Sequence, residues 1–142
     1  MSQVTKNKLI EEITIQSHNS ISNFLFALKA PESKRQYPKR LKLFFDFGLD
    51  KNLVLEEQAD LFLEEANKEK NGVQWATQYF IQFLNYQKER VQRGDISEST
   101  IPNYYKAAKL FCVMNDLILN WEKINRSPVS GQDKYRKVEV CY

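Results

Sequence analysis

The sequence has few of the side chains that usually hold metal ions or act as catalytic bases. It contains one histidine, His18, and two cysteines, Cys112 and Cys141, in 142 residues. Neither cysteine belongs to a CxxC pair or has a histidine at metal-ligand spacing, so neither a zinc site nor a disulfide framework is predicted. His18 stands in a polar stretch without the positioned partner that a general base needs. We therefore expect no cofactor, no metal site and free thiols, and interpret His18 as a loop residue.

Glycine and proline are also scarce, with four of each, and no apolar run exceeds a few residues. A membrane-spanning helix needs about 20 apolar residues, so no span is predicted. The first residues include Lys6, Lys8, Glu11 and Glu12 and lack the apolar core of a secretory signal. We expect a cytoplasmic protein with no membrane partner, and no small-molecule substrate is evident.

Apolar residues recur mainly at three- and four-residue intervals, which predicts an all-α fold, a compact bundle of four to five helices. The expected helices cover residues 20–29, 32–47, 55–69 and 73–93, and a fifth follows the Gly94-Asp95 turn and runs to about residue 117. Pro38 predicts a kink in the second helix or a late start. Gly48 is the expected C-cap of that helix.

The length fits one domain that buries its core without metals or disulfides. We assign residues 18–122 to the helical domain and residues 1–17 to an N-terminal extension, helical or frayed. Beyond Asn125 the chain becomes polar and rich in turn residues. Residues 123–142 are therefore expected to be a weakly ordered tail.

The net charge of +3 is modest, but its distribution along the chain is uneven. Residues 1–48 have a net charge of +4, residues 49–72 of −4 and residues 73–142 of +3. If the two basic parts meet in space, they form a positive surface for phosphates.

The segment 96–111 combines a helix start with a helix that is half basic and half apolar. Ser97 and Ser99 are both suitable N-cap residues, and free amide groups at a helix start suit a phosphate. On a helical wheel the apolar side holds Ile101, Tyr105, Ala108 and Cys112, and the polar side holds Ser99, Asn103, Lys106 and Lys109. The segment therefore predicts one side facing the core and one facing a ligand.

Together with the cations of the 32–47 helix, this segment supplies the candidate contacts to DNA. The candidates are Lys34, Arg35, Lys39, Arg40, Lys42, Ser99, Thr100, Asn103, Tyr104, Lys106 and Lys109. The basic residues would neutralise phosphates, and the others would lie at the groove or the backbone. A solubilising surface charge is the usual role of any single lysine, so the prediction depends on the clustering of the two segments.

Both segments carry spaced patterns. The first consists of Ser33, Tyr37, Leu41, Phe44 and Phe47, and the second of Ser97, Thr100, Ile101, Asn103, Ala107, Lys109 and Phe111. In this order, about 60 residues apart, they resemble two helices of the N-terminal core-binding (SAM-like) domain of tyrosine recombinases, the family of phage integrases and Xer-type recombinases. The resemblance covers roughly residues 18–122. The chain departs from the pattern at Ala108, at Lys109, where arginine is usual, and at Pro102.

The resemblance implies a compact helical domain that clamps one side of a DNA duplex while a separate catalytic domain closes on the other. Lysine lacks the planar fork that reads guanine, so Lys109 would contact phosphate. The family's catalytic domain, with its tyrosine nucleophile and its arginine, lysine and histidine residues, is not expected in this chain. Tyr142 lacks the cationic surroundings that a phenol needs to attack a phosphodiester. We therefore expect a module that binds double-stranded DNA and is not an enzyme.

Two alternatives stay open. The chain could be a protein-interaction bundle that pairs with a full-length recombinase and modulates it, through its acidic 55–69 helix and through Leu43, Leu110 and Val113. It could also be a truncated remnant of a recombinase that keeps the fold without the function. For the acidic helix, a merely solvated surface is the simpler interpretation.

Overall fold

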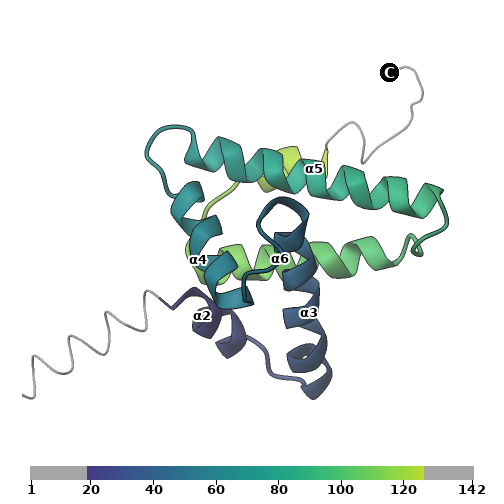
Figure 1. The fold of residues 1–142 in the computed structure, drawn as a ribbon, viewed down its shortest axis with the longest axis horizontal. Coiled ribbons are helices and arrows are strands. Elements are labelled where there is room, and N and C mark those ends of the chain that lie inside the picture. Colours follow the sequence, from purple (N-terminus) through teal and green to yellow (C-terminus); the bar gives the residue numbers. More distant parts are fainter. Residues whose placement is uncertain (1–18, 127–142) are drawn as a thin grey trace, which may run out of the picture.

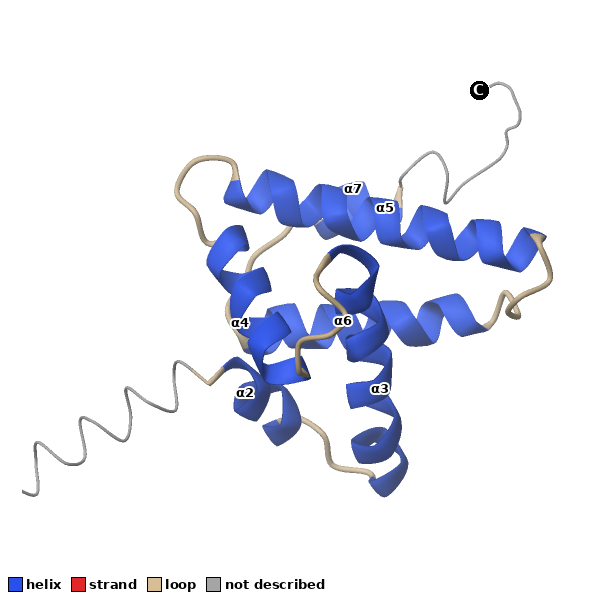
Figure 2. Ribbon diagram, in the orientation of Figure 1, coloured by secondary structure: helices blue, strands red, loops and turns tan. Residues whose placement is uncertain are grey.

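The computed structural model describes residues 19–126, which form an all-α bundle (Figures 1 and 2). Its helices are α2 (Ser20–Phe26), α3 (Pro31–Gly48), α4 (Leu55–Ala66), α5 (Gly72–Gln92), α6 (Thr100–Met114) and α7 (Trp121–Asn125). The predicted all-α class is confirmed, and each of the five expected helices is present with its ends shifted by a few residues. The short α7 was not predicted as a helix.

The helical part of the chain extends past the expected boundary at residue 122. Ile124, in α7, is fully buried, and the Asn120 side chain caps this helix by accepting a hydrogen bond from the Lys123 amide at 2.9 Å. The expectations for the 1–17 extension, for most of the 123–142 tail and for His18, Cys141 and Tyr142 lie outside the described residues.

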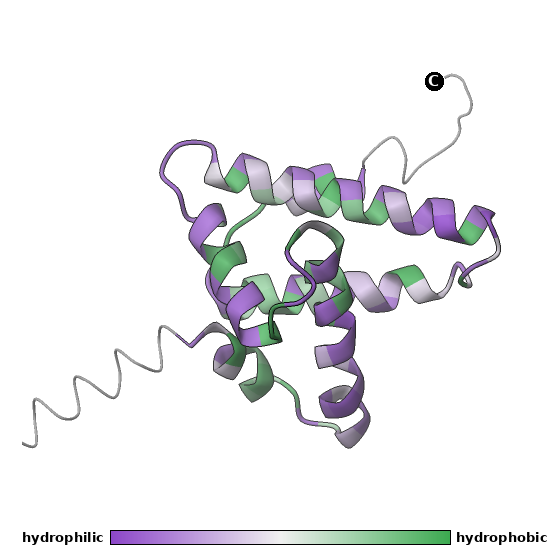
Figure 3. Ribbon diagram, viewed as in Figure 1, coloured by the Kyte–Doolittle hydropathy of each residue, from purple (hydrophilic) through white to green (hydrophobic). Residues whose placement is uncertain are grey.

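Helices α5 and α6 run in opposite directions and are joined by a turn with Gly94 at a positive φ of 83°. Figure 1 shows α3 crossing α6 and ending beside α5, with α2 and α4 at the end where α6 finishes and α7 behind α5 in Figure 2. The N-terminal half of α3 is coloured hydrophilic in Figure 3. The C-terminal half of α3, between α6 and α5, lies at the centre of the fold.

Aromatic rings fill this centre. The ring of Phe44 in α3 lies 4.8 Å from Phe80 and 5.0 Å from Phe83, both in α5, and 5.5 Å from Phe62 in α4. All four side chains are fully buried. Burying one phenylalanine contributes about 1.5–3 kcal/mol, so the cluster accounts for much of the favourable packing energy.

Asn115, just after α6, connects the end of α6 to α2. Its amide nitrogen donates to the carbonyl oxygens of Ser20, at 3.1 Å, and Phe111, at 2.9 Å. Its side-chain oxygen accepts a hydrogen bond from the Asn23 amide at 3.0 Å. One side chain thus fixes α2 against the end of α6.

The expected cap at Gly48 is wrong, and of the two outcomes predicted for Pro38 the late start is excluded. The helix begins at Pro31 and continues through Pro38 to Gly48. Pro31 has no N–H to satisfy and suits the first helical turn. Gly48 is the last helical residue, and it lacks the positive φ of a left-handed cap. A Cβ at Gly48 would overlap the ring of Tyr79, so close packing is what requires glycine there.

No helix within residues 19–126 is long and apolar enough to cross a membrane.

Candidate nucleic-acid interface

The predicted DNA-binding cations of α3 divide into two groups, and the first group is held by carboxylates. Arg35 pairs with Glu32 at 2.7 Å, and hydrogen bonds from Arg35 and Gln36 lower the pKa of Glu32. Lys42 pairs with Asp46 at 2.6 Å and donates to the carbonyl of Lys51 at 3.1 Å. Arg35 and Lys42 are therefore less available to a phosphate than the sequence predicted.

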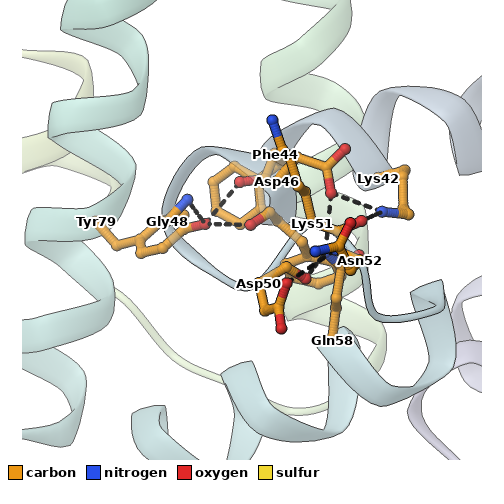
Figure 4. A network of polar contacts seen from close by, with 10 residues as sticks. Lys42, Phe44, Asp46, Gly48, Asp50, Lys51, Asn52, Gln58 and Tyr79 are labelled. Carbon is orange, nitrogen blue, oxygen red and sulfur yellow. Dashed lines mark hydrogen bonds and ion pairs between the residues drawn. The ribbon is translucent and has the colours of Figure 1, made fainter.

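Lys42 belongs to a polar joint between α3 and α4 (Figure 4). The buried Gln58 donates to Asp46 at 2.9 Å and to the carbonyl of Asp50 at 3.0 Å. Burial raises the pKa of Asp46, but hydrogen bonds from Lys42 and Gln58 outweigh that effect, and the pKa lies below its usual value. The joint keeps Lys42 in a structural role.

The second group consists of Lys34, Lys39 and Arg40. Lys34 and Lys39 are exposed, and Arg40 is half-buried with its guanidinium 5.6 Å from the centre of the Tyr37 ring. Within residues 19–126 no carboxylate forms an ion pair with any of the three. No direct ion pair therefore compensates the positive charge of these three side chains.

The start of α6 differs from the expected phosphate site. Ser99 is at the N-cap position but makes no side-chain cap. The Ser97 hydroxyl accepts from the Ser99 amide at 3.3 Å and shares a hydrogen bond with the Ser99 hydroxyl at 3.0 Å. The Thr100 amide bonds to the carbonyl of Ser97 at 3.0 Å, and the Ile101 amide to that of Glu98 at 3.2 Å. Residue 102 is proline and has no N–H. The expectation of free amide donors here is therefore wrong.

Two of the α6 candidates pack against aromatic rings. The Tyr104 ring is half-buried and lies 6.2 Å from that of Phe83. The ammonium of Lys109 lies 5.7 Å from the centre of the Tyr105 ring and 5.2 Å from that of Trp121. These contacts give both residues a part in packing α6 against its neighbours.

Lys109 also lies on the wrong side of α6 to join the cations of α3. The ring of Phe111 contacts that of Phe45 in α3 at 5.2 Å. Residues two positions apart in a helix point about 160° away from each other. Lys109 therefore faces away from the α3 contact, as does Lys106, about 140° from Phe111 around the helix. The contact between α6 and α3 brings neither lysine together with Lys39 or Arg40.

The remaining α6 candidates are Ser99, Thr100, Asn103 and Lys106. Ser99 and Lys106 are exposed, whereas Thr100 and Asn103 are half-buried. Ser99, Asn103 and Lys106 follow one flank of the helix, and Lys106 forms no ion pair among the described residues. Helices α3 and α6 cross, and beyond the crossing the N-terminal half of each helix extends in its own direction (Figure 1). We call these two N-terminal halves the arms of α3 and α6.

An aromatic and basic pair at the end of α5 was not among the sequence candidates. The ring of Tyr86, 40% exposed, lies 5.6 Å from Phe47 in α3 and 5.9 Å from the guanidinium of Arg93. Arg93 also pairs with Asp95 at 3.1 Å. Tyr86 and Arg93 are seven residues apart, about two helical turns, so they lie on the same side of the helix. This spacing at a basic helix end could have indicated the pair from the sequence.

No protein-family model matches the sequence, and no curated protein and no solved structure match it either. Among residues 19–126 there is also no group of three or more histidine, cysteine or acidic side chains able to hold a metal ion. The case for a function therefore depends on the chemistry of the side chains described above.

Proposed function

We propose that this chain is a module that binds double-stranded DNA without cleaving it. The observation that supports the proposal best is the N-terminal half of α3, where Lys34, Lys39 and Arg40 occupy a hydrophilic arm and no described carboxylate pairs with them. Lys106 adds a fourth such cation from the arm of α6. The resemblance of these same two segments to the core-binding domain of tyrosine recombinases favours the same function.

The dimensions and chemistry of the two arms suit a duplex. A helix with its side chains is about 10–12 Å wide, and the major groove of B-DNA is about 12 Å wide. Uncompensated ammonium and guanidinium groups bind phosphates and release condensed counterions. Ser99 and Asn103, on the flank that carries Lys106, supply hydrogen-bonding groups for the sugar-phosphate backbone.

The salt dependence of binding tests this proposal. Four phosphate contacts give a slope of about −3 to −4 for log affinity against log salt concentration, at about −0.9 per contact. We expect this slope in fluorescence anisotropy titrations of a labelled 20-base-pair duplex. Lys39→Glu and Lys106→Glu should each weaken binding, whereas Lys70→Glu, with the same change of charge between α4 and α5, should not.

Either of two results would overturn the proposal: an affinity that does not change with salt, or Lys39→Glu and Lys106→Glu variants that bind like Lys70→Glu. Incubation of the protein with supercoiled plasmid separates binding from cleavage. The plasmid is expected to stay supercoiled, because the proposed contacts hold phosphates but supply no nucleophile.

A further inference from the structure

The outer side of α4 carries a shallow hollow that combines two leucines with three carboxylates. Its volume is about 490 Å³, and it is lined by Leu53, Glu57, Asp60, Leu61 and Glu64. Leu61 is 43% exposed. A leucine that lines a hollow while remaining this accessible offers apolar surface to a partner.

A second hollow lies beside the first and shares two of its carboxylates. Asp60 and Glu64 line both, and the second has a volume of about 480 Å³. Its other lining residues come from three parts of the chain: Ser20 and Asn23 in α2, Leu63 and Asn67 at α4, and Asn115 and Asp116 after α6. The first hollow thus combines leucines with carboxylates, and the second is lined mostly by residues of polar type.

The carboxylates around these hollows are not neutralised within the molecule. Asp60 accepts a hydrogen bond from the Ser20 hydroxyl at 2.9 Å, and no ion pair involves Glu57, Asp60, Glu64 or Asp116 among residues 19–126. A cation placed there would therefore gain attraction without displacing an internal partner.

The loop that supplies Leu53 to the first hollow is held in shape by the joint of Figure 4. Leu53 follows a loop in which the Asn52 amide bonds to the Asp50 carboxylate at 3.0 Å and the Leu53 amide to the Asp50 carbonyl at 3.2 Å. Gln58 and Lys42 bind this loop from α4 and α3. A surface that is already formed loses little conformational entropy when a partner binds.

We propose that these two hollows dock a cationic amphipathic helix of a partner protein. An apolar side chain of that helix contacts Leu53 and Leu61, and a lysine or arginine lies against Asp60 and Glu64. Charge complementarity selects a basic occupant, and the exposed leucine selects one that also presents an apolar side. This surface does not use the cations proposed to bind DNA, so it does not depend on that proposal.

The test uses a fluorescein-labelled 16-residue helical peptide with leucine on one side and lysine on the other, and anisotropy at 0.1 M salt. The intact chain is expected to bind it. The Asp60→Asn/Glu64→Gln double variant should weaken binding at least tenfold, and Leu61→Ser several-fold. Glu98→Gln, a neutralisation of an exposed carboxylate before α6, is the matched control and should bind like the wild type.

A peptide of the same composition, with lysine and leucine distributed evenly around its helix, separates docking from charge attraction. Equal binding of both peptides would overturn the proposal, as would unchanged binding by the double variant. A chain that instead self-associates in sedimentation experiments through Leu61, without binding the peptide, would identify a second copy as the occupant and would also overturn it. Circular dichroism checks that each variant is folded.

Discussion

The hydroxyl of Tyr79 in α5 accepts a hydrogen bond from the amide of Gly48 at 2.9 Å and donates one to the carbonyl of Phe44 at 2.7 Å. The phenol also lies 3.1 Å from the carbonyl of Phe45, which already accepts from the Leu49 amide, so it adds hydrogen bonds to the last turn of α3. Burial raises the pKa of Tyr79 far above its usual value, so the hydroxyl keeps its proton and its role as donor. The contact fixes the end of α3 against α5.

Loss of this hydroxyl is expected to destabilise the fold. Tyr79→Phe removes the buried hydroxyl from the Gly48 amide and from the carbonyls of Phe44 and Phe45, which costs about 1–3 kcal/mol. Urea denaturation followed by circular dichroism measures the change. Tyr37→Phe is the control, because the Tyr37 hydroxyl has no hydrogen bond among the described residues. Equal stability of Tyr79→Phe and Tyr37→Phe would contradict the assigned role.

Gly72, at the start of α5, is expected to resist substitution. A Cβ at this position would overlap the carbonyl of Ala66, which belongs to the backbone and cannot rotate away. Gly72→Ala should lower the free energy of unfolding by about 1–3 kcal/mol, although alanine is the better helix former. Gly94→Asn is a useful comparison, since nothing lies near a Cβ there and asparagine tolerates its positive φ. An unchanged melting temperature for Gly72→Ala would show that the α4–α5 junction moves apart easily.

Lys106 and Lys109 are predicted to behave differently although both lie on α6. Lys106→Ala should reduce the salt slope of DNA binding by about one unit and leave stability unchanged. Lys109→Ala should leave the slope unchanged and reduce stability by about 0.5–1 kcal/mol, because it removes the contacts with Tyr105 and Trp121. Anisotropy titrations and urea denaturation of both variants measure the two effects. A smaller slope for Lys109→Ala would place this lysine at the DNA instead.

Acid is expected to weaken the α3–α4 joint. The pKa of Asp46 is lower in the folded chain than its usual value, so its contribution to stability is complete above about pH 5 and is lost as the pH falls through the folded pKa. The contribution is less than about 1 kcal/mol, because the side chain is one-third exposed. The Asp46→Asn variant should therefore show a smaller decrease in the free energy of unfolding between pH 5 and pH 2. A decrease equal to that of wild type would show that the Lys42 pair contributes nothing.

The helices could be predicted from the sequence because their apolar residues repeat with the period of a helix. Phe44 and Phe62, for example, stand on such stripes and are fully buried. The five residues of α7 are too few for a periodic signal, so α7 was missed. The resemblance to recombinase domains and the DNA-binding role stay predictions, because no residue pattern alone establishes a ligand.

The candidate site was harder to predict, because the environment of a cation depends on contacts between helices. Lys109 and Trp121 are twelve residues apart, and only the packing of α7 brings them together. The pairing of Lys42 with Asp46 had the ordinary i, i+4 spacing and was available in the sequence. Whether the amides at the start of α6 are free depends on the geometry of the preceding turn. The serine and proline residues of this turn do not specify that geometry by themselves.

The hydrogen bonds of Asn115 also constrain the order in which the fold can form. Asn23 and Ser20 are 92 and 95 residues from this partner along the chain. During synthesis α2 leaves the ribosome long before Asn115 does, so its final docking must wait until α6 is complete. Contacts between such distant residues slow folding because a long loop has to close first. Until then only α4 and the Tyr37 ring of α3, 6.5 Å from that of Phe24, cover the apolar side of α2, and at this stage the growing chain exposes its buried surface to aggregation.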